Sequence, residues 1–363
     1  MNKIQSVFWL IFLPAIISSC ANHQKINAFK YETNKSIEVK RGAVVSAHAL
    51  ASEVGVSILR QGGNAVDAAI ATQFALAVVH PSAGNIGGGG FTIIHLKDGK
   101  NISIDYREMA PGAAFRDMYL DKDGNPLMNL SQDSHLSSGV PGAVAGMFAA
   151  MKYAKLPMKK LIQPAIDLAE YGHVITAMDA RSLNYTQKDF IKMNTVTPVF
   201  VKEGGWKAGD TLIQKDLANT LKRIRDNGEK GFYEGETARL IVEEMKRGKG
   251  IITLEDLKNY FAKEREPIVF DYRGNTVVTM PLPSSGGIIV EQMLKMSAMK
   301  GIDKMKFETA ESVQLMTEVE RRAFADRAKF LGDPDFYKVP VKTLVSDEYL
   351  KMRMSDFVPG KAG

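Results

Sequence analysis

Four consecutive glycines, Gly87 to Gly90, constrain the fold of this chain more than any other feature of its sequence. Glycine loses the most backbone freedom on ordering, so a helix through this run is unfavourable, and the run indicates a close approach of the backbone to another part of the molecule. Residues 91–96 and 101–106 follow as two strand-like segments, and the Asp98-Gly99 pair between them is typical of a hairpin turn. We therefore predict a β-hairpin directly after the glycines.

Arg107 ends the second predicted strand. Side chains alternate between the faces of a strand, so Ser103, Asp105 and Arg107 are expected on a polar face opposite the apolar residues at 102, 104 and 106. The pattern alone favours a surface ion pair at a strand end, which contributes little to stability. The alternative interpretation is that this planar, permanently charged group, held on a rigid strand, binds a carboxylate through two parallel hydrogen bonds.

The amino-terminal segment predicts export. Lys3 precedes a short apolar run at residues 7–17, which is typical of a signal peptide and too short to span a bilayer. Cys20, the only cysteine, stands at the end of this run, as in bacterial lipoprotein signals, and excludes an intrachain disulfide. We expect a signal at 1–19, lipidation of Cys20, a flexible tether at 20–40 and a folded domain at 41–363. An ordinary cleaved signal with a chance cysteine is the alternative.

Beyond the tether lie more than three hundred residues, and the whole chain is 45% hydrophobic, which is enough for one large core or two closely joined lobes. Two apolar helical segments followed by the glycines and the hairpin indicate helices laid against a sheet, an α+β arrangement. Asn64 and Thr253 are expected to begin helices, and Ser284 and Ser285 to cap a third. The paired charges around residues 321–322 and 326–327 are interpreted as surface and capping ion pairs. Strands are predicted at 43–47, 267–272 and 275–280, and helices at 49–60, 65–79, 163–172, 214–227, 234–247 and 308–330.

Several kinds of function are not indicated by the motifs. The glycine runs lack the spacing of a phosphate-binding loop, Ser284 and Ser285 lack the context of a hydrolase nucleophile, and the six histidines lack metal-ligand spacing. The net charge of +6 is spread over 363 residues and is weak grounds for nucleic-acid binding. We expect no cofactor, no metal and no nucleic-acid partner.

Six motifs in one order carry a resemblance to a known family. They are GGNAVDAAIA at 62–71, GGGGF at 87–91, DYRE at 105–108, SGVPGAVAG at 138–146, PSSGG at 283–287 and ADRAKFLGDPDF at 325–336. Together they resemble the large subunit of γ-glutamyltransferases, which are N-terminal-nucleophile hydrolases. The resemblance implies an αββα sandwich and a precursor that cuts itself into a large and a small subunit. It also implies that the amino-terminal threonine of the small subunit is the nucleophile.

The same resemblance assigns one substrate contact to this chain. Arg107 would bind the α-carboxylate of a γ-glutamyl group, taken from glutathione or a related compound and passed to water or to an acceptor amino acid or peptide. The T-T-H motif that opens the small subunit does not occur in the sequence. We therefore expect no catalytic residue in this chain, a small subunit as its heterodimer partner, and an inert, poorly soluble polypeptide when it is alone.

Two other functions remain open from the sequence. A related acylase acting on cephalosporin-type side chains is compatible with Arg107, because such side chains also end in a carboxylate. A non-catalytic surface lipoprotein that binds amino acids or peptides is the alternative from another class. We expect an exported position, periplasmic or at the cell surface and anchored through Cys20, which would suit the salvage of glutathione.

Overall fold

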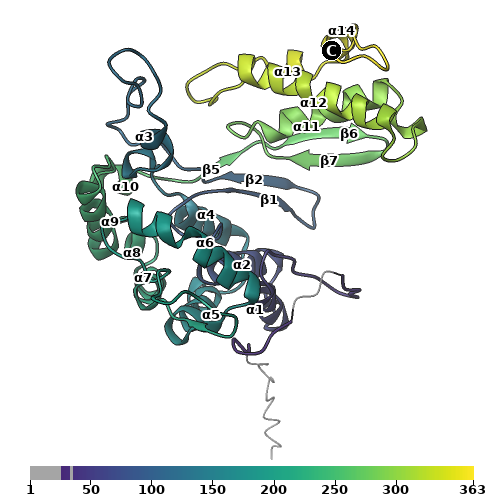
Figure 1. Ribbon diagram of the computed structural model, residues 1–363. Helices are drawn as coiled ribbons and strands as arrows, with labels where there is room; N and C mark the ends of the chain where they lie inside the picture. Colours follow the sequence, from purple (N-terminus) through teal and green to yellow (C-terminus); the bar gives the residue numbers. More distant parts are fainter. Residues whose placement is uncertain (1–25, 33–35) are drawn as a thin grey trace, which may run out of the picture.

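The computed structural model describes residues 26–32 and 36–363. Figure 1 shows two parts, which we call the first lobe (residues 26–266) and the second lobe (residues 267–363). Apolar side chains of the first lobe form one large cluster and one small one, and those of the second lobe form two small clusters. Among the described residues, no apolar cluster joins the two lobes.

The first lobe contains ten α-helices and five strands among its described residues. Its helices are α1 Ala49–Arg60, α2 Ala65–Val79, α3 Met128–Gln132, α4 Ala143–Ala150, α5 Met158–Tyr171, α6 Ala177–Met193, α7 Lys215–Asn227, α8 Lys230–Tyr233, α9 Gly235–Arg247 and α10 Leu254–Lys258. Its strands are β1 Phe91–His95, β2 Asn101–Asp105, β3 His173–Val174, β4 Thr211–Leu212 and β5 Lys263–Arg265.

The second lobe is a β-hairpin covered by helices. Its strands are β6 Ile268–Tyr272 and β7 Asn275–Thr279, and its helices are α11 Gly286–Met299, α12 Ala310–Phe330, α13 Val341–Leu344 and α14 Asp347–Arg353. In Figure 1 the hairpins β1–β2 and β6–β7 lie between the helices of the two lobes, so the layers run helix, sheet, sheet, helix. The predicted α+β class with its sandwich order of layers is confirmed.

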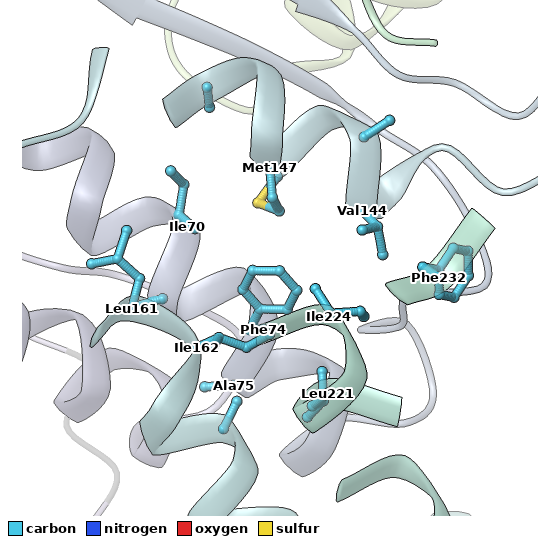
Figure 2. Packing of buried hydrophobic residues seen from close by; sticks show 14 of the residues in the cluster. Ile70, Phe74, Ala75, Val144, Met147, Leu161, Ile162, Leu221, Ile224 and Phe232 are labelled. Atoms are coloured by element: carbon cyan, nitrogen blue, oxygen red, sulfur yellow. The ribbon is translucent and has the colours of Figure 1, made fainter. Parts of the chain in front are cut away.

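The core of the first lobe is built around α2. Asn64 caps this helix, as the sequence predicted: its side-chain oxygen accepts from the backbone N–H groups of Val66 and Asp67. In turn, the Asp67 carboxylate accepts from the Asn64 backbone N–H. Alanines let neighbouring helices approach closely on nearly all sides. Figure 2 shows Phe74 of α2 surrounded by side chains of α4, α5 and α7, which include Met147, Leu161, Ile162 and Ile224.

Both predicted hairpins are confirmed, and the first has an additional strand. β1 pairs antiparallel with β2, from Phe91 opposite Asp105 to His95 opposite Asn101. β5 adds to the far edge of β2, with Ser103 opposite Arg265 and Asp105 opposite Lys263. The β1–β2–β5 sheet therefore brings residues from the end of the first lobe beside the strand that carries Arg107.

Three predictions about local structure were wrong. Residues 43–47 form no strand, because no described strand lies beside them, and Val45 is 89% exposed. Ser285 stands at the N-cap of α11 without a side-chain capping bond, so the prediction holds only for Ser284, whose hydroxyl accepts from the Gly286 N–H at the start of the helix. The paired charges on α12 are not all at the surface, because Arg322 and Asp326 are buried within the second lobe.

Candidate functional site

A cavity of about 470 Å³ lies between the two lobes at the end of β2. The first lobe contributes the end of β2 and the segment through β5, and the second lobe contributes the turn before α11 and the end of α12 with the loop after it. Eight of the eighteen lining residues are charged. They are Asp105, Arg107, Glu108, Lys263, Arg265, Arg327, Asp333 and Asp335.

The backbone of Arg107 is fixed from several directions. Tyr106 exchanges two backbone hydrogen bonds with Gly90, of 3.1 and 3.3 Å, so the hairpin continues beyond the assigned strands. The buried Tyr260 hydroxyl donates to the Arg107 carbonyl oxygen at 2.8 Å. The Asp105 carboxylate accepts from the Arg107 N–H at 3.1 Å. Arg107 is thus held on a rigid support at the rim of the cavity.

The glycine run has a steric role at this point. A Cβ on Gly89 would lie 2.4 Å from the Tyr106 carbonyl oxygen, and a Cβ on Gly142 would lie 2.1 Å from both that oxygen and the Tyr260 hydroxyl. Neither position can accept a side chain without moving the backbone that carries Arg107. The prediction that the glycines mark a close backbone approach is confirmed, and the approached segment is the end of β2.

The expected pairing of Arg107 with Asp105 is wrong. Asp105 is 7% exposed, and its side chain accepts from Arg265 Nε at 2.7 Å and from the Arg107 backbone instead. The partner comes from β5, about 160 residues away in the sequence, and local alternation gives no sign of it. Ser103 is likewise buried and donates to the Arg265 carbonyl oxygen.

The positively charged side chains around the cavity differ in their hydrogen-bond partners. Arg265 and Lys263 both donate to Asp335, at 2.8 and 2.6 Å for the shortest contacts. The hydrogen bonds from Arg265 lower the pKa of the Asp335 carboxyl, and the same bonds raise the pKa of Arg265. Arg327 donates to the Ser285 hydroxyl at 3.0 Å.

The Arg107 guanidinium has neither an ion pair nor a hydrogen bond within residues 26–32 and 36–363, and its Cζ lies 6.0 Å from the centre of the Phe91 ring. Arg107 is exposed, so its donors face the cavity. A guanidinium in this position can accept an added carboxylate through two parallel hydrogen bonds. It is the group at this site that the sequence identified.

Sequence reasoning missed the residues that surround Arg107. Lys263, Arg265 and Tyr260 lie in a segment that carries no motif, and only their position beside β2 reveals their roles. Asp335 belongs to the LGDPDF segment, whose recurrence in the resemblance was the one available signal. That signal marked the segment as part of the family pattern, but it did not indicate that Asp335 binds Lys263 and Arg265.

Two other predicted features need comment. Cys20 and the predicted signal at 1–19 lie outside the described residues. Within the predicted tether, Tyr31 donates its hydroxyl to the Val174 carbonyl oxygen at 2.9 Å, and Ala28 accepts from the Val174 N–H, so this part contacts β3. Over the described part of the chain, no cluster of side chains suits a metal ion, and no helix is long and apolar enough to cross a membrane.

Comparison with known proteins identifies similar chains. The family model described as gamma-glutamyltranspeptidase matches residues 51–362. The glutathione hydrolase proenzyme of Escherichia coli K12 is 48% identical over 318 residues, which are 87% of this chain and 55% of that protein. An acylase, the ACY 1 proenzyme of a Pseudomonas species (strain V22), is 37% identical over 321 residues, which are 86% of this chain and 58% of that protein.

A solved structure has the same fold. The crystal structure of Helicobacter pylori gamma-glutamyltranspeptidase superimposes with a TM-score of 0.87 at 44% identity, and the match covers 90% of this chain and 95% of that one. The chain spans about half the length of the curated relatives it matches. Because the family model matches more than half of the sequence and the fold agrees, the chain belongs to the gamma-glutamyltranspeptidase family.

Proposed function

We propose that this chain is the large-subunit part of a γ-glutamyltransferase or glutathione hydrolase, and that Arg107 binds the α-carboxylate of the γ-glutamyl group. The observation that carries the proposal is the Arg107 guanidinium, which faces the cavity without a carboxylate partner in the described chain, while Arg265 and Lys263 beside it are paired. A fixed, unpaired guanidinium selects acyl groups that bring their own carboxylate.

The proposed reaction is an acyl transfer. The hydroxyl oxygen of a threonine attacks the γ-carbonyl carbon, the carbon–nitrogen bond breaks, and the amine leaves with a proton. Water or an acceptor amine then attacks the resulting ester, which releases glutamate or a new γ-glutamyl compound and restores the hydroxyl. In this scheme the residues of this chain bind and orient the glutamyl group, and the nucleophile belongs to the part of the relatives that this chain does not match.

The test of Arg107 is its removal from the whole enzyme. Arg107→Ala should lower kcat/KM for a γ-glutamyl substrate at least about a hundredfold, because a desolvated carboxylate loses the charged partner that binds it through two hydrogen bonds. Arg107→Lys should recover only part of the loss, since an ammonium cannot form the two parallel bonds. Arg116→Ala is the matched control, because Arg116 is 95% exposed and lies outside the cavity. An Arg107→Ala enzyme with unchanged kcat/KM would refute the assignment.

The heterodimer is part of the same proposal. Some relatives are named proenzymes, and this chain covers 55% of the Escherichia coli proenzyme but 95% of the solved Helicobacter pylori chain. This difference supports a precursor that is cut into two chains, of which the present sequence corresponds to one. The 363-residue polypeptide alone should release no glutamate from a γ-glutamyl substrate, and the addition of a small subunit that begins with T-T-H should be required for activity.

An acylase is the second candidate, and the similar ACY 1 proenzyme favours it. Arg107 suits an acyl side chain that ends in a carboxylate as well as it suits a glutamyl group. Parallel assays of the whole enzyme with a γ-glutamyl amide and with a cephalosporin that carries a carboxylate-ended side chain separate the two. A binding lipoprotein would bind amino acids or peptides and turn over neither compound.

We also propose export, lipidation of Cys20 and the division into signal, tether and folded domain set out above. The short apolar run that ends at Cys20 supports this location. Radioactive palmitate should label the protein in the cell, and Cys20→Ala should abolish the label. Labelling that persists in the Cys20→Ala variant would contradict lipidation at this residue.

A further inference from the structure

The two lobes share little besides the cavity between them. Each lobe has its own apolar clusters, and the chain passes from one to the other only at residues 265–268. Within the described residues, every ion pair and hydrogen bond that joins the lobes ends on one side chain, that of Asp335. Apart from the chain connection, a single carboxylate therefore makes the polar contacts that join the cavity walls within the described residues.

Asp335 is bound more tightly than an ordinary surface carboxylate. Arg265 donates to both of its oxygens, Nη1 to Oδ1 at 3.1 Å and Nη2 to Oδ2 at 2.8 Å, and Lys263 Nζ donates to Oδ2 at 2.6 Å. The Arg265 side chain is 16% exposed and that of Asp335 is 32% exposed. Two-fold contacts of a partly desolvated guanidinium are stronger and more directional than exposed pairs.

The loop that carries Asp335 is itself ordered. Asp333 Oδ1 accepts from the Asp335 N–H at 2.9 Å, and the Asp333 carbonyl oxygen accepts from the N–H groups of Phe336 and Tyr337. This turn presents the Asp335 carboxylate toward β5. Leu331, Asp333 and Phe336 of the same loop line the cavity, so the loop is both the wall and its attachment.

The contact continues from Arg265 to the proposed substrate group. Arg265 Nε donates to Asp105 Oδ2 at 2.7 Å, and Asp105 Oδ1 accepts from the Arg107 N–H at 3.1 Å. The Asp105 side chain is 8% exposed, so its position is fixed by these bonds. Hydrogen bonds thus connect the second lobe, through two side chains, to the backbone of the residue that faces the cavity.

We propose that Asp335 is a latch that sets the position of the second lobe over the cavity, and that Asp335 and Arg265 are positioning residues for Arg107. Asp335 holds the wall opposite Arg107, and Arg265 joins that wall to Asp105 beneath Arg107. The effect on catalysis rests on the proposed function, whereas the effect on the lobes does not. Removal of the latch should leave each lobe folded and widen the range of positions between them.

The lobe arm of the test uses spin labels and requires no activity. Exposed positions on α6 and α13 carry the labels through Asp189→Cys and Lys342→Cys, with Cys20→Ser to remove the native thiol. Asp335→Ala should broaden the distance distribution measured by pulsed electron resonance. Arg265→Lys should broaden it as well, because one ammonium cannot form a two-fold contact with Asp335 and also bind Asp105.

Glu264→Gln is the matched control for the spin-label test and for the kinetic test described below. Glu264 lies on the same strand β5, but it pairs with Lys152 at 2.9 Å and with the Tyr153 hydroxyl, all within the first lobe. Its replacement should leave the distance distribution unchanged. The latch would be refuted if the distance distribution were the same in the spin-labelled protein with Asp335, in the Asp335→Ala variant and in this control.

The kinetic arm separates positioning from general structural damage. In the whole enzyme, Asp335→Ala should raise KM for a γ-glutamyl substrate about tenfold with a smaller change in kcat, because displaced binding groups weaken substrate capture. Damage to folding would lower the active fraction and hence the apparent kcat at constant KM, which would refute the positioning role. Asp335→Asn, which keeps the shape and loses the charge, provides the same comparison if the alanine variant fails to fold. An unmodified enzyme without γ-glutamyl turnover would refute the proposed function and leave the spin-label test intact.

Discussion

The two lobes of this chain are stabilised by different means. The first lobe buries one large cluster of apolar side chains around α2, and its buried Asp67 is bonded to the Asn64, Lys155 and Leu156 N–H groups. The second lobe has only two small apolar clusters, and it buries Gln292, Glu318, Arg322 and Asp326 among its helices. The difference indicates that substitutions of equal size act through cavities in one lobe and through unpaired charges in the other.

The buried charges of the second lobe form one network. Arg322 donates to the Arg353 carbonyl oxygen at 2.8 Å and to Asp356 Oδ1 at 2.6 Å, and it is paired with Glu318. Hydrogen bonds, chiefly from Arg321, lower the pKa of Glu318 to about 2. Because its members satisfy one another, the network holds α12 against α14 where few apolar side chains are available.

The largest effect is expected from the apolar core. Phe74 is 1% exposed and lies at the centre of the cluster in Figure 2. Phe74→Ala should lower the free energy of unfolding of the first lobe by about 4 kcal/mol, through lost burial and the cavity left behind. Denaturant titration followed by circular dichroism measures the change. Phe115→Ala is the control, because Phe115 is 66% exposed and its loss should have little effect.

A smaller effect is expected from the charged core. Arg322→Met should lower the free energy of unfolding of the second lobe by about 3 kcal/mol, because Glu318 and Asp356 lose a partner while Glu318 stays buried. Glu318→Leu combined with Arg322→Met should recover part of that loss, since an apolar pair has no charge to desolvate. If the double variant is less stable than Arg322→Met alone, the charge explanation for this lobe is wrong.

Much of the fold could be predicted because local signals and packing agreed. The capping residues Asn64 and Thr253 begin α2 and α10, and α1 spans the residues that periodicity assigned to it. The α6 helix was not predicted, because it has only a weak apolar stripe: of its residues, only Ala180 and Leu183 are buried. The prediction of a strand at 43–47 was wrong because extended backbone becomes a strand only beside another strand.

The candidate site was less predictable than the fold. Arg107 could be identified from its place in the DYRE motif, but the residues that support it come from β5 and from the loop after α12. Sequence alternation describes the two faces of one strand and carries no information about the strand beside it. The burial of Asp105 was missed for this reason, since its partner Arg265 comes from β5. The burial of Arg322 was missed because Asp356 and the Arg353 carbonyl oxygen, which it also binds, come from a part of the chain about 30 residues away.

The smallest of these effects is a difference in acid sensitivity between the two lobes. His173 in the first lobe is 1% exposed, its Nδ1 has no hydrogen-bond partner among the described residues, and His48 and Asp179 are the titratable groups near it. Burial, with a smaller contribution from His48, lowers the pKa of His173 to about 4. The unfolded chain therefore binds the proton more readily, so the contribution of neutral His173 is full above about pH 6.5 and declines as the pH falls toward 4.

Between pH 7 and pH 5, this histidine should cost the first lobe roughly 2 kcal/mol of unfolding free energy. His173→Leu should remove that part of the decline, measured as the difference between denaturant titrations at the two pH values. The Glu318 network should persist over the same range, because its stability is lost only as the pH falls toward the folded pKa of about 2. A His173→Leu variant that loses as much stability as the unmodified chain would show that another group sets the acid sensitivity of the first lobe. The contrast between unpaired and paired buried groups would then no longer account for the difference between the lobes.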